Sequence, residues 1–132
     1  MAGLLAVAIA AVAAALAARP GAPAAAEGGI TFSDHGVKEV RGQAEIELEA
    51  DNHYFKPTFL QGAPGQKLKL EIENESRSRH NISIPDQGID RDIPPKGKIE
   101  IDVTFPPSGK VLFSCKYHRK RGMNGELRTG GS

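Results

Sequence analysis

Apolar residues recur at every second position in several short segments of the chain, and this pattern constrains the fold more than any other feature. In residues 67–73, Leu68, Leu70 and Ile72 fall on one face of an extended segment, and charged residues fall on the other. The same alternation runs through residues 45–49, 98–105 and 110–115. Period-two alternation is typical of strands with one face in a core and the other in solvent. The sequence therefore predicts strands.

Clusters of proline and glycine separate these segments, at residues 62–65, 94–97 and 106–109. Such clusters are turn-forming. Shorter apolar segments at 81–84 and 126–129 add two further strands, and no window after residue 27 has convincing helical spacing. Short strands at regular intervals predict an all-β sandwich or barrel.

The N-terminus has a different character from the rest of the chain. Residues 1–18 are rich in alanine and carry no charged side chain, and small residues at 24–26 offer a signal-peptidase site. This pattern predicts a signal peptide over residues 1–26, and hence a periplasmic or extracellular protein. The alternative is an uncleaved membrane anchor, although the run is short and weakly apolar for a span. Either interpretation places the remaining chain outside the cytoplasmic membrane.

The rest of the chain fits one domain. A length of 132 residues is typical of a single core, and we expect a leader or edge strand over 27–44 followed by a domain over 45–132. The net charge of +1 argues against a nucleic-acid partner, and 5% aromatic residues argue against a base-stacking surface. A single cysteine excludes an intramolecular disulfide and any zinc site built on two cysteines.

One group of residues carries chemistry. Cys115, His118 and Met123 are spaced Cys-x2-His-x4-Met in a loop between two predicted strands, and His80 opens the strand at 81–84. A thiolate, two imidazoles and a thioether form a borderline-to-soft donor set that suits copper. The thiolate and imidazoles form a trigonal plane, and the methionine is a long axial ligand. The sequence therefore predicts one copper ion held by these four residues.

Each of these residues also has a simpler explanation. Cys115 alone is more often a buried core residue, and His80 alone is more often a surface residue. Met123 lies in a polar loop with no apolar face to join. The combination is much more specific than any single member. Zinc bound by the cysteine, both histidines and a water remains an alternative.

The other two histidines have no partners at ligand spacing. We interpret His35 and His53 as exposed or structural rather than as a second metal site, which would need several converging ligands. The aromatic residues near His53 are interpreted as core, namely Tyr54, Phe55 and Phe59.

On these residues the chain resembles the cupredoxin family of small blue-copper proteins over residues 45–130, with a ligand loop similar to that of plastocyanin and pseudoazurin. The resemblance extends to residues 51–60, the pair His80–Asn81, residues 111–115 and residues 123–125. It implies a Greek-key β-sandwich with copper near one end, bound by His80, Cys115, His118 and Met123.

The resemblance also implies two supporting roles. Asn81 would hydrogen-bond across to the cysteine loop and tie the two ligand segments together, and His118 would reach the surface at an apolar patch and pass electrons. This chain departs from the family in its basic loop, which contains Lys116, Arg119, Lys120 and Arg121. The charges put the apolar docking patch in doubt but not the ligand set.

These observations favour an exported one-electron carrier, monomeric, with a redox protein partner that has an acidic docking face. The alternative is copper storage or delivery without electron transfer. Storage and delivery prefer an open site that exchanges its ion. An enzyme is disfavoured because His118 is better used as a ligand than as the base of a catalytic cysteine. Membrane association is expected only if the N-terminal segment stays attached.

Overall fold

The structure is a computed structural model that describes residues 26–27 and 29–130. Nearly all of the predicted signal peptide, residues 1–26, lies outside these described residues. Within them, no helix is both long enough and apolar enough to cross a membrane.

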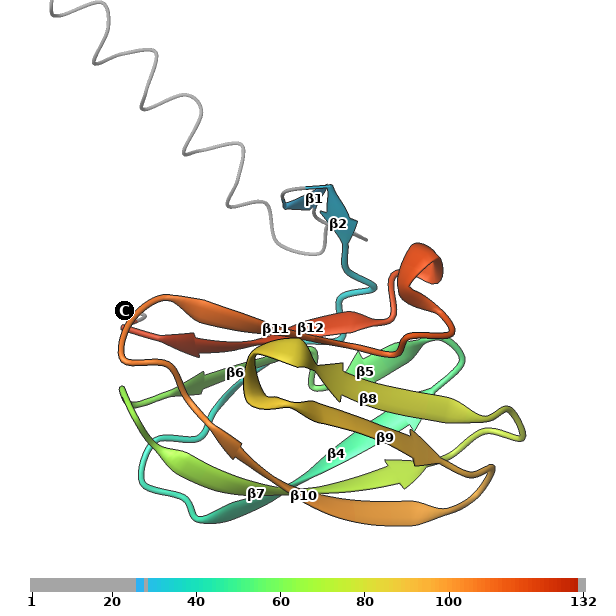
Figure 1. The fold of residues 1–132 in the computed structure, drawn as a ribbon, viewed down its shortest axis with the longest axis horizontal. Coiled ribbons are helices and arrows are strands. Elements are labelled where there is room, and N and C mark those ends of the chain that lie inside the picture. The colour runs from blue at the N-terminus through green and yellow to red at the C-terminus, as the bar shows by residue number, and fades with distance from the viewer. Residues whose placement is uncertain (1–25, 28, 131–132) are drawn as a thin grey trace, which may run out of the picture.

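Two β-sheets pack face to face (Figure 1). The four-stranded sheet has the order β10 (Lys98–Thr104), β7 (Lys67–Asn74), β4 (Glu45–Asp51) and β5 (Tyr54–Lys56). The six-stranded sheet has the order β3 (Val37–Glu39), β6 (Phe59–Gly62), β12 (Asn124–Thr129), β11 (Lys110–Ser114), β8 (His80–Ile84) and β9 (Ile89–Ile93). A small hairpin, β1 (Ala26–Glu27) and β2 (Ile30–Thr31), precedes them, and η1 (Pro85–Gln87) and η2 (Arg119–Arg121) are single 3₁₀ turns. The predicted all-β sandwich is confirmed.

The alternating segments form the strands that the pattern predicts. In β7, the buried positions are Leu68, Leu70, Ile72 and the terminal Asn74, and the residues between them face outward. This inward row packs in the core between the sheets together with Ile82 and other apolar residues from both sheets. The core also contains Cys115 and Met123, each with no exposed surface. Two predicted ligands thus belong to the hydrophobic core itself.

Four of the strands in the two sheets lack a clear sequence signal. β9 reads Ile-Asp-Arg-Asp-Ile, and its three central residues are exposed. It forms a strand because it pairs antiparallel with β8 along the whole length of both strands, at the edge of the sheet. The strands β3, β5 and β6 are only three or four residues long. Phe55 and Phe59 in this region are buried as predicted, whereas Tyr54 is half-buried.

The strand order in the six-stranded sheet positions the candidate metal ligands. β11 lies between β8 and β12, and Ser114 pairs with Ser83 of β8. The loop from β11 to β12 therefore passes the start of β8, where His80 lies. Residues far apart in the sequence meet at one end of the sandwich because of this adjacency.

Candidate metal centre

Three potential metal donors converge at this end of the sandwich. The Nδ1 atoms of His80 and His118 are 3.3 Å apart, and the Cys115 Sγ is 3.4 Å from the His118 Nδ1. All three donor atoms lie within 4.8 Å of one another. His80 and Cys115 have no exposed surface, and His118 is half-buried. The donors therefore face a single shared position.

Backbone hydrogen bonds close the loop that carries two of these donors. The Cys115 N–H donates to the Met123 carbonyl at 3.0 Å, and the Met123 N–H donates to the His118 carbonyl at 3.2 Å. The His118 N–H in turn donates to the Cys115 carbonyl at 3.0 Å. The turn η2 lies between His118 and the fully buried Met123. The loop thus holds the predicted ligands Cys115, His118 and Met123 in one compact unit.

Burial sets the protonation of these groups in the copper-free protein. It lowers the pKa of His80 to about 4, with smaller contributions from His118 and His53. Burial also lowers the pKa of His118 and raises the pKa of the Cys115 thiol. Neutral imidazoles are the form that binds a metal. The charge of a bound metal would deprotonate the Cys115 thiol. The site would then offer two neutral nitrogens and one thiolate, a donor set suited to a cation.

A chain of hydrogen bonds fixes the His80 ring from behind. Its Nε2 lies 3.0 Å from the Ser76 hydroxyl, which lies 2.8 Å from the Asn74 Oδ1. Asn74 Nδ2 donates to the Ser78 carbonyl at 2.8 Å. With Nε2–H donating to Ser76 and Ser76 donating to Asn74, the lone pair of His80 lies on Nδ1, toward the other donors. No motif or ligand spacing in the sequence marks Ser76, which lies in a polar turn before the ligand strand.

Asn81 joins the ligand strand to the ligand loop. Its Oδ1 accepts a hydrogen bond from the Lys116 backbone N–H at 3.2 Å and another from the Ser83 hydroxyl at 2.8 Å. Its Nδ2 donates to Asp90 at 2.8 Å and to Asp92 at 3.1 Å. The contact to Lys116 is directly beside Cys115, so Asn81 ties the two ligand segments together.

The two remaining histidines differ from each other. His35 is exposed and stacks on Tyr54 at a centroid distance of 3.6 Å. His53 lies against the donor group, with its ring centroid 4.4 Å from that of His118 and 6.2 Å from that of His80. Sequence spacing did not place His53 here, because the turn between β4 and β5 reaches the site only through the folded sandwich.

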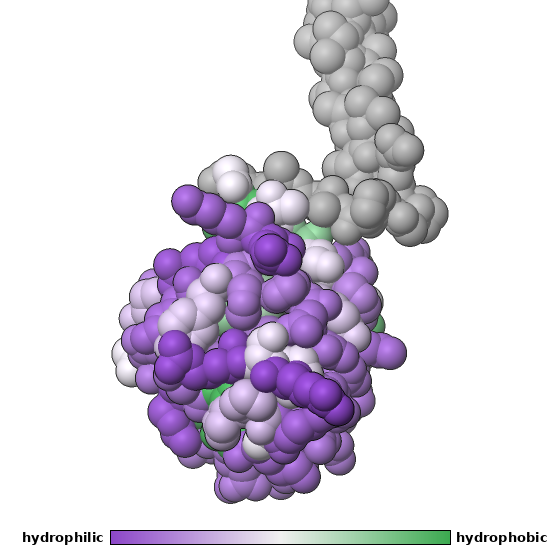
Figure 2. Space-filling model, turned by 90° about the vertical axis from the view of Figure 1, so that its right-hand side faces the viewer, coloured by the Kyte–Doolittle hydropathy of each residue, from purple (hydrophilic) through white to green (hydrophobic). Residues whose placement is uncertain are grey.

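The surface at this end of the molecule is mainly hydrophilic (Figure 2). Some of its positive charge is paired: the Lys116 Nζ lies 3.1 Å from Asp90, and Arg79 lies 3.8 Å from Asp92. The three basic residues of η2 are exposed, and none forms an ion pair with a carboxylate in the described part of the chain. Three unpaired positive charges of this end therefore lie together on η2.

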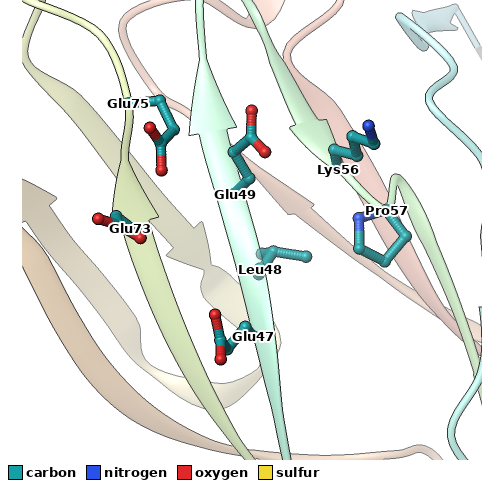
Figure 3. Close-up of a pocket in the computed structure, with 7 residues that line it drawn as sticks. All are labelled: Glu47, Leu48, Glu49, Lys56, Pro57, Glu73 and Glu75. Carbon is teal, nitrogen blue, oxygen red and sulfur yellow. The ribbon is translucent and has the colours of Figure 1, made fainter.

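A separate group of carboxylates lies on the four-stranded sheet. A hollow there is lined by Lys56, Leu48, Pro57 and four acidic residues (Figure 3), namely Glu47, Glu49, Glu73 and Glu75. The neighbouring Glu73 carboxylate raises the pKa of Glu75. Exposed glutamates Glu45 and Glu100 also approach the half-buried Glu71. Because exposed carboxylates commonly gather without a ligand, we assign these groups no site.

The family profile described as cupredoxin-like domain matches residues 4–127. No curated protein matches the chain.

Solved structures show the same fold at low sequence identity. The metal-binding domain of the Cu(I)-exporting P-type ATPase CopA of Streptococcus pneumoniae D39, solved with Cu(I), is 18% identical, with a TM-score of 0.59 over 71% of this chain and 97% of that one. The reduced auracyanin of Roseiflexus castenholzii is 18% identical, with a TM-score of 0.56 over 67% and 98%. Auracyanin A of Chloroflexus aurantiacus, described as a blue copper protein, is 17% identical, with a TM-score of 0.57 over 66% and 98%.

The donors fit a copper ion. Two imidazole nitrogens and one thiolate match the ligand types of trigonal copper sites, and their atoms already face one another. The fold and the group of His80, Cys115 and His118 identify a single copper ion as the cofactor. The family profile covers most of the chain, from residue 4 to residue 127, and the chain belongs to the cupredoxin-like domain family.

Proposed function

We propose that this protein carries single electrons between extracytoplasmic redox partners at a mononuclear type 1 copper site. The observation that carries this proposal is the buried donor group held from two sides, by Ser76 behind His80 and by Asn81 beside Cys115. Copper supplies a one-electron couple between Cu(I) and Cu(II) when bound. Donors fixed in the protein move little between the two states, which favours fast electron transfer.

His118 is the proposed route for the electron. It is the only one of the three donor residues with exposed surface, since His80 and Cys115 are fully buried. The surface at this end of the molecule is mainly hydrophilic (Figure 2), and the unpaired charges of η2 are positive. We expect a partner with an acidic docking face, which such charges would attract and orient. The predicted signal peptide places this exchange in the periplasm or outside the cell.

The domain is proposed to have no enzymatic activity of its own. The thiol and both imidazoles of the group serve as copper ligands, which leaves no free base beside a free nucleophile.

Copper storage or delivery is the second candidate. It is favoured by the likeness to the CopA metal-binding domain, which was solved with Cu(I). A delivery site must release its ion readily, whereas this one is buried and tied by hydrogen bonds. The two functions therefore differ in how readily the site should release its copper ion.

The test is to add Cu(II) to the purified protein and to record its visible and EPR spectra. A type 1 site gives an intense thiolate-to-copper band in the red and a narrow copper hyperfine splitting. Cys115→Ser would remove the band, which assigns it to this thiolate. A colourless product, or the weak bands of a tetragonal Cu(II) site, would reject the electron carrier and leave storage or delivery of Cu(I).

Docking is tested on the same protein by its electron exchange with small charged redox reagents. Reversing two charges of η2, in the variant R119E/K120E, should slow reduction by an anionic reagent and speed reduction by a cationic one. The matched control K67E/K69E makes the same charge change on the four-stranded sheet. Equal effects of both variants would mean that net charge, and not the surface of η2, governs the encounter.

A further inference from the structure

The carboxylates of Asp90 and Asp92 form the outer end of the hydrogen-bond network that reaches the ligand loop. We propose that these two residues of β9 are positioning residues for the copper centre, because they orient the Asn81 amide that holds the loop at Lys116. The inference depends on copper binding but not on electron transfer, so it can be tested whichever copper function is correct.

The Asn81 side chain can be held in only one orientation. Its Nδ2 faces Asp90 and Asp92 at 2.8 and 3.1 Å, so both of its hydrogens have acceptors. Rotating the amide by half a turn would point Oδ1 at two carboxylates and Nδ2 at the Lys116 N–H. Both contacts would be repulsive. The carboxylates therefore determine that the oxygen of Asn81 faces the ligand loop.

This orientation matters because of where Asn81 lies. It is fully buried and directly follows the ligand His80, and it accepts the N–H of Lys116, which directly follows the ligand Cys115. The Ser83 hydroxyl donates to the same Oδ1 at 2.8 Å. One amide thus connects the two chain segments that supply the donors, and an amide free to rotate would leave the Lys116 N–H without this acceptor.

The same two carboxylates are held on their outer side by the ligand loop. The Lys116 Nζ lies 3.1 Å from Asp90, and the Tyr117 hydroxyl lies 2.9 Å from both oxygens of Asp92. The Arg79 guanidinium lies 4.5 Å from the centre of the Tyr117 ring. Hydrogen bonds from Asn81 lower the pKa of both carboxyl groups, so both stay ionised as acceptors. β9, β8 and the loop are thereby joined around one buried amide.

The experiment compares three double variants of the full-length protein. D90A/D92A removes both acceptors and both charges. D90N/D92N removes the charges but keeps an amide oxygen that can accept from Asn81. D86N/D102N removes two charges from exposed carboxylates outside this network. We expect D90A/D92A to lose copper affinity by roughly ten- to a hundredfold, the usual range for residues that orient ligands, and to shift the thiolate-to-copper band.

D90N/D92N should lose less affinity than D90A/D92A, and D86N/D102N should match the wild type. In the copper-free protein, the Lys116 backbone amide should exchange with solvent faster in D90A/D92A, a readout that needs no metal. Thermal unfolding checks that each variant is folded, and the single variants D90A and D92A take the place of the double variant if it unfolds.

A cycle with N81A tests whether the carboxylates act through Asn81. If they do, adding D90A/D92A to N81A produces little further loss of copper affinity, because the amide that they orient is already gone. The proposal is overturned if the losses add in full, if D90N/D92N is as damaging as D90A/D92A, or if D90A/D92A leaves both affinity and Lys116 exchange unchanged.

Discussion

The imidazole of His53 packs against the imidazole of His118, with the ring centroids 4.4 Å apart and the rings inclined at 54°. His118 is the one donor residue with exposed surface. His53 also meets the edge of the His80 ring at 6.2 Å. A side chain from the turn between β4 and β5 thus packs against both histidines of the donor group.

Replacing His53 by alanine should expose the copper to added ligands. The copper-loaded H53A protein is expected to bind azide at about tenfold lower concentration than the wild type, equivalent to about 1.4 kcal/mol. Titration with azide, followed in the visible spectrum, measures this. His35→Ala is the matched control, since His35 stacks on Tyr54 instead. Equal azide binding by H53A and wild type would show that His53 does not shield the site.

Replacing Ser76 by alanine should loosen the His80 ring. The His80 Nε2–H would lose its acceptor inside the protein, which costs about 1–3 kcal/mol of stability. Copper affinity should fall by roughly tenfold, because the ring is no longer held. Competition with a chelator measures the affinity. Ser78→Ala, which removes a neighbouring hydroxyl outside this chain of bonds, should behave as the wild type; a similar loss in both variants would contradict the role of Ser76.

The copper-free protein should lose stability in mild acid. The pKa of His80 is about 4 in the fold, mainly through burial, and 6.5 when unperturbed. Between these values the unfolded chain binds a proton that the folded chain does not, so stability falls as the pH drops from about 6.5 to about 4. This difference between the two pKa values of His80 corresponds to about 3 kcal/mol of unfolding free energy. Urea unfolding at pH 7 and pH 4.5 tests this, and His80→Gln should flatten the dependence. A pH-independent midpoint in the wild type would refute it.

Replacing Gly125 by alanine should destabilise the sandwich. A Cβ at this position would overlap both the Phe113 ring and the Thr58 carbonyl oxygen. The ring is buried and the carbonyl belongs to the backbone, so neither can move aside easily, and the expected cost is about 3 kcal/mol or more. Urea unfolding measures it. An alanine variant with the midpoint of the wild type would mean that the backbone at Thr58 yields at little cost.

Sequence patterns predicted the long strands well because each has one face in the core. β7 and β10 alternate between buried and outward positions along most of their length, with only a few residues partly exposed. β8 is buried at all five positions and β9 is exposed at three, so neither alternates. Their pairing depends on neighbouring strands, and local periodicity carries no information about a neighbour.

By itself, the sequence determined the chemistry of the site. The residue types and the short spacing from Cys115 to Met123 are local properties of one loop, and so is the soft donor set that they are predicted to provide. The alternation of apolar residues likewise determined that the chain would fold into strands.

Only the tertiary structure decided which other residues surround these donors. His53 over His118 and the two carboxylates of β9 on Asn81 come from segments that meet through strand order. Ser76 lies only four residues before His80, and its contact with that ring depends on how the turn before β8 folds. Such contacts depend on which strands lie side by side and on which turns reach the same end of the sandwich. The physical reason is that a hydrogen bond or ring contact is set by distance in space, which the fold supplies and sequence spacing does not.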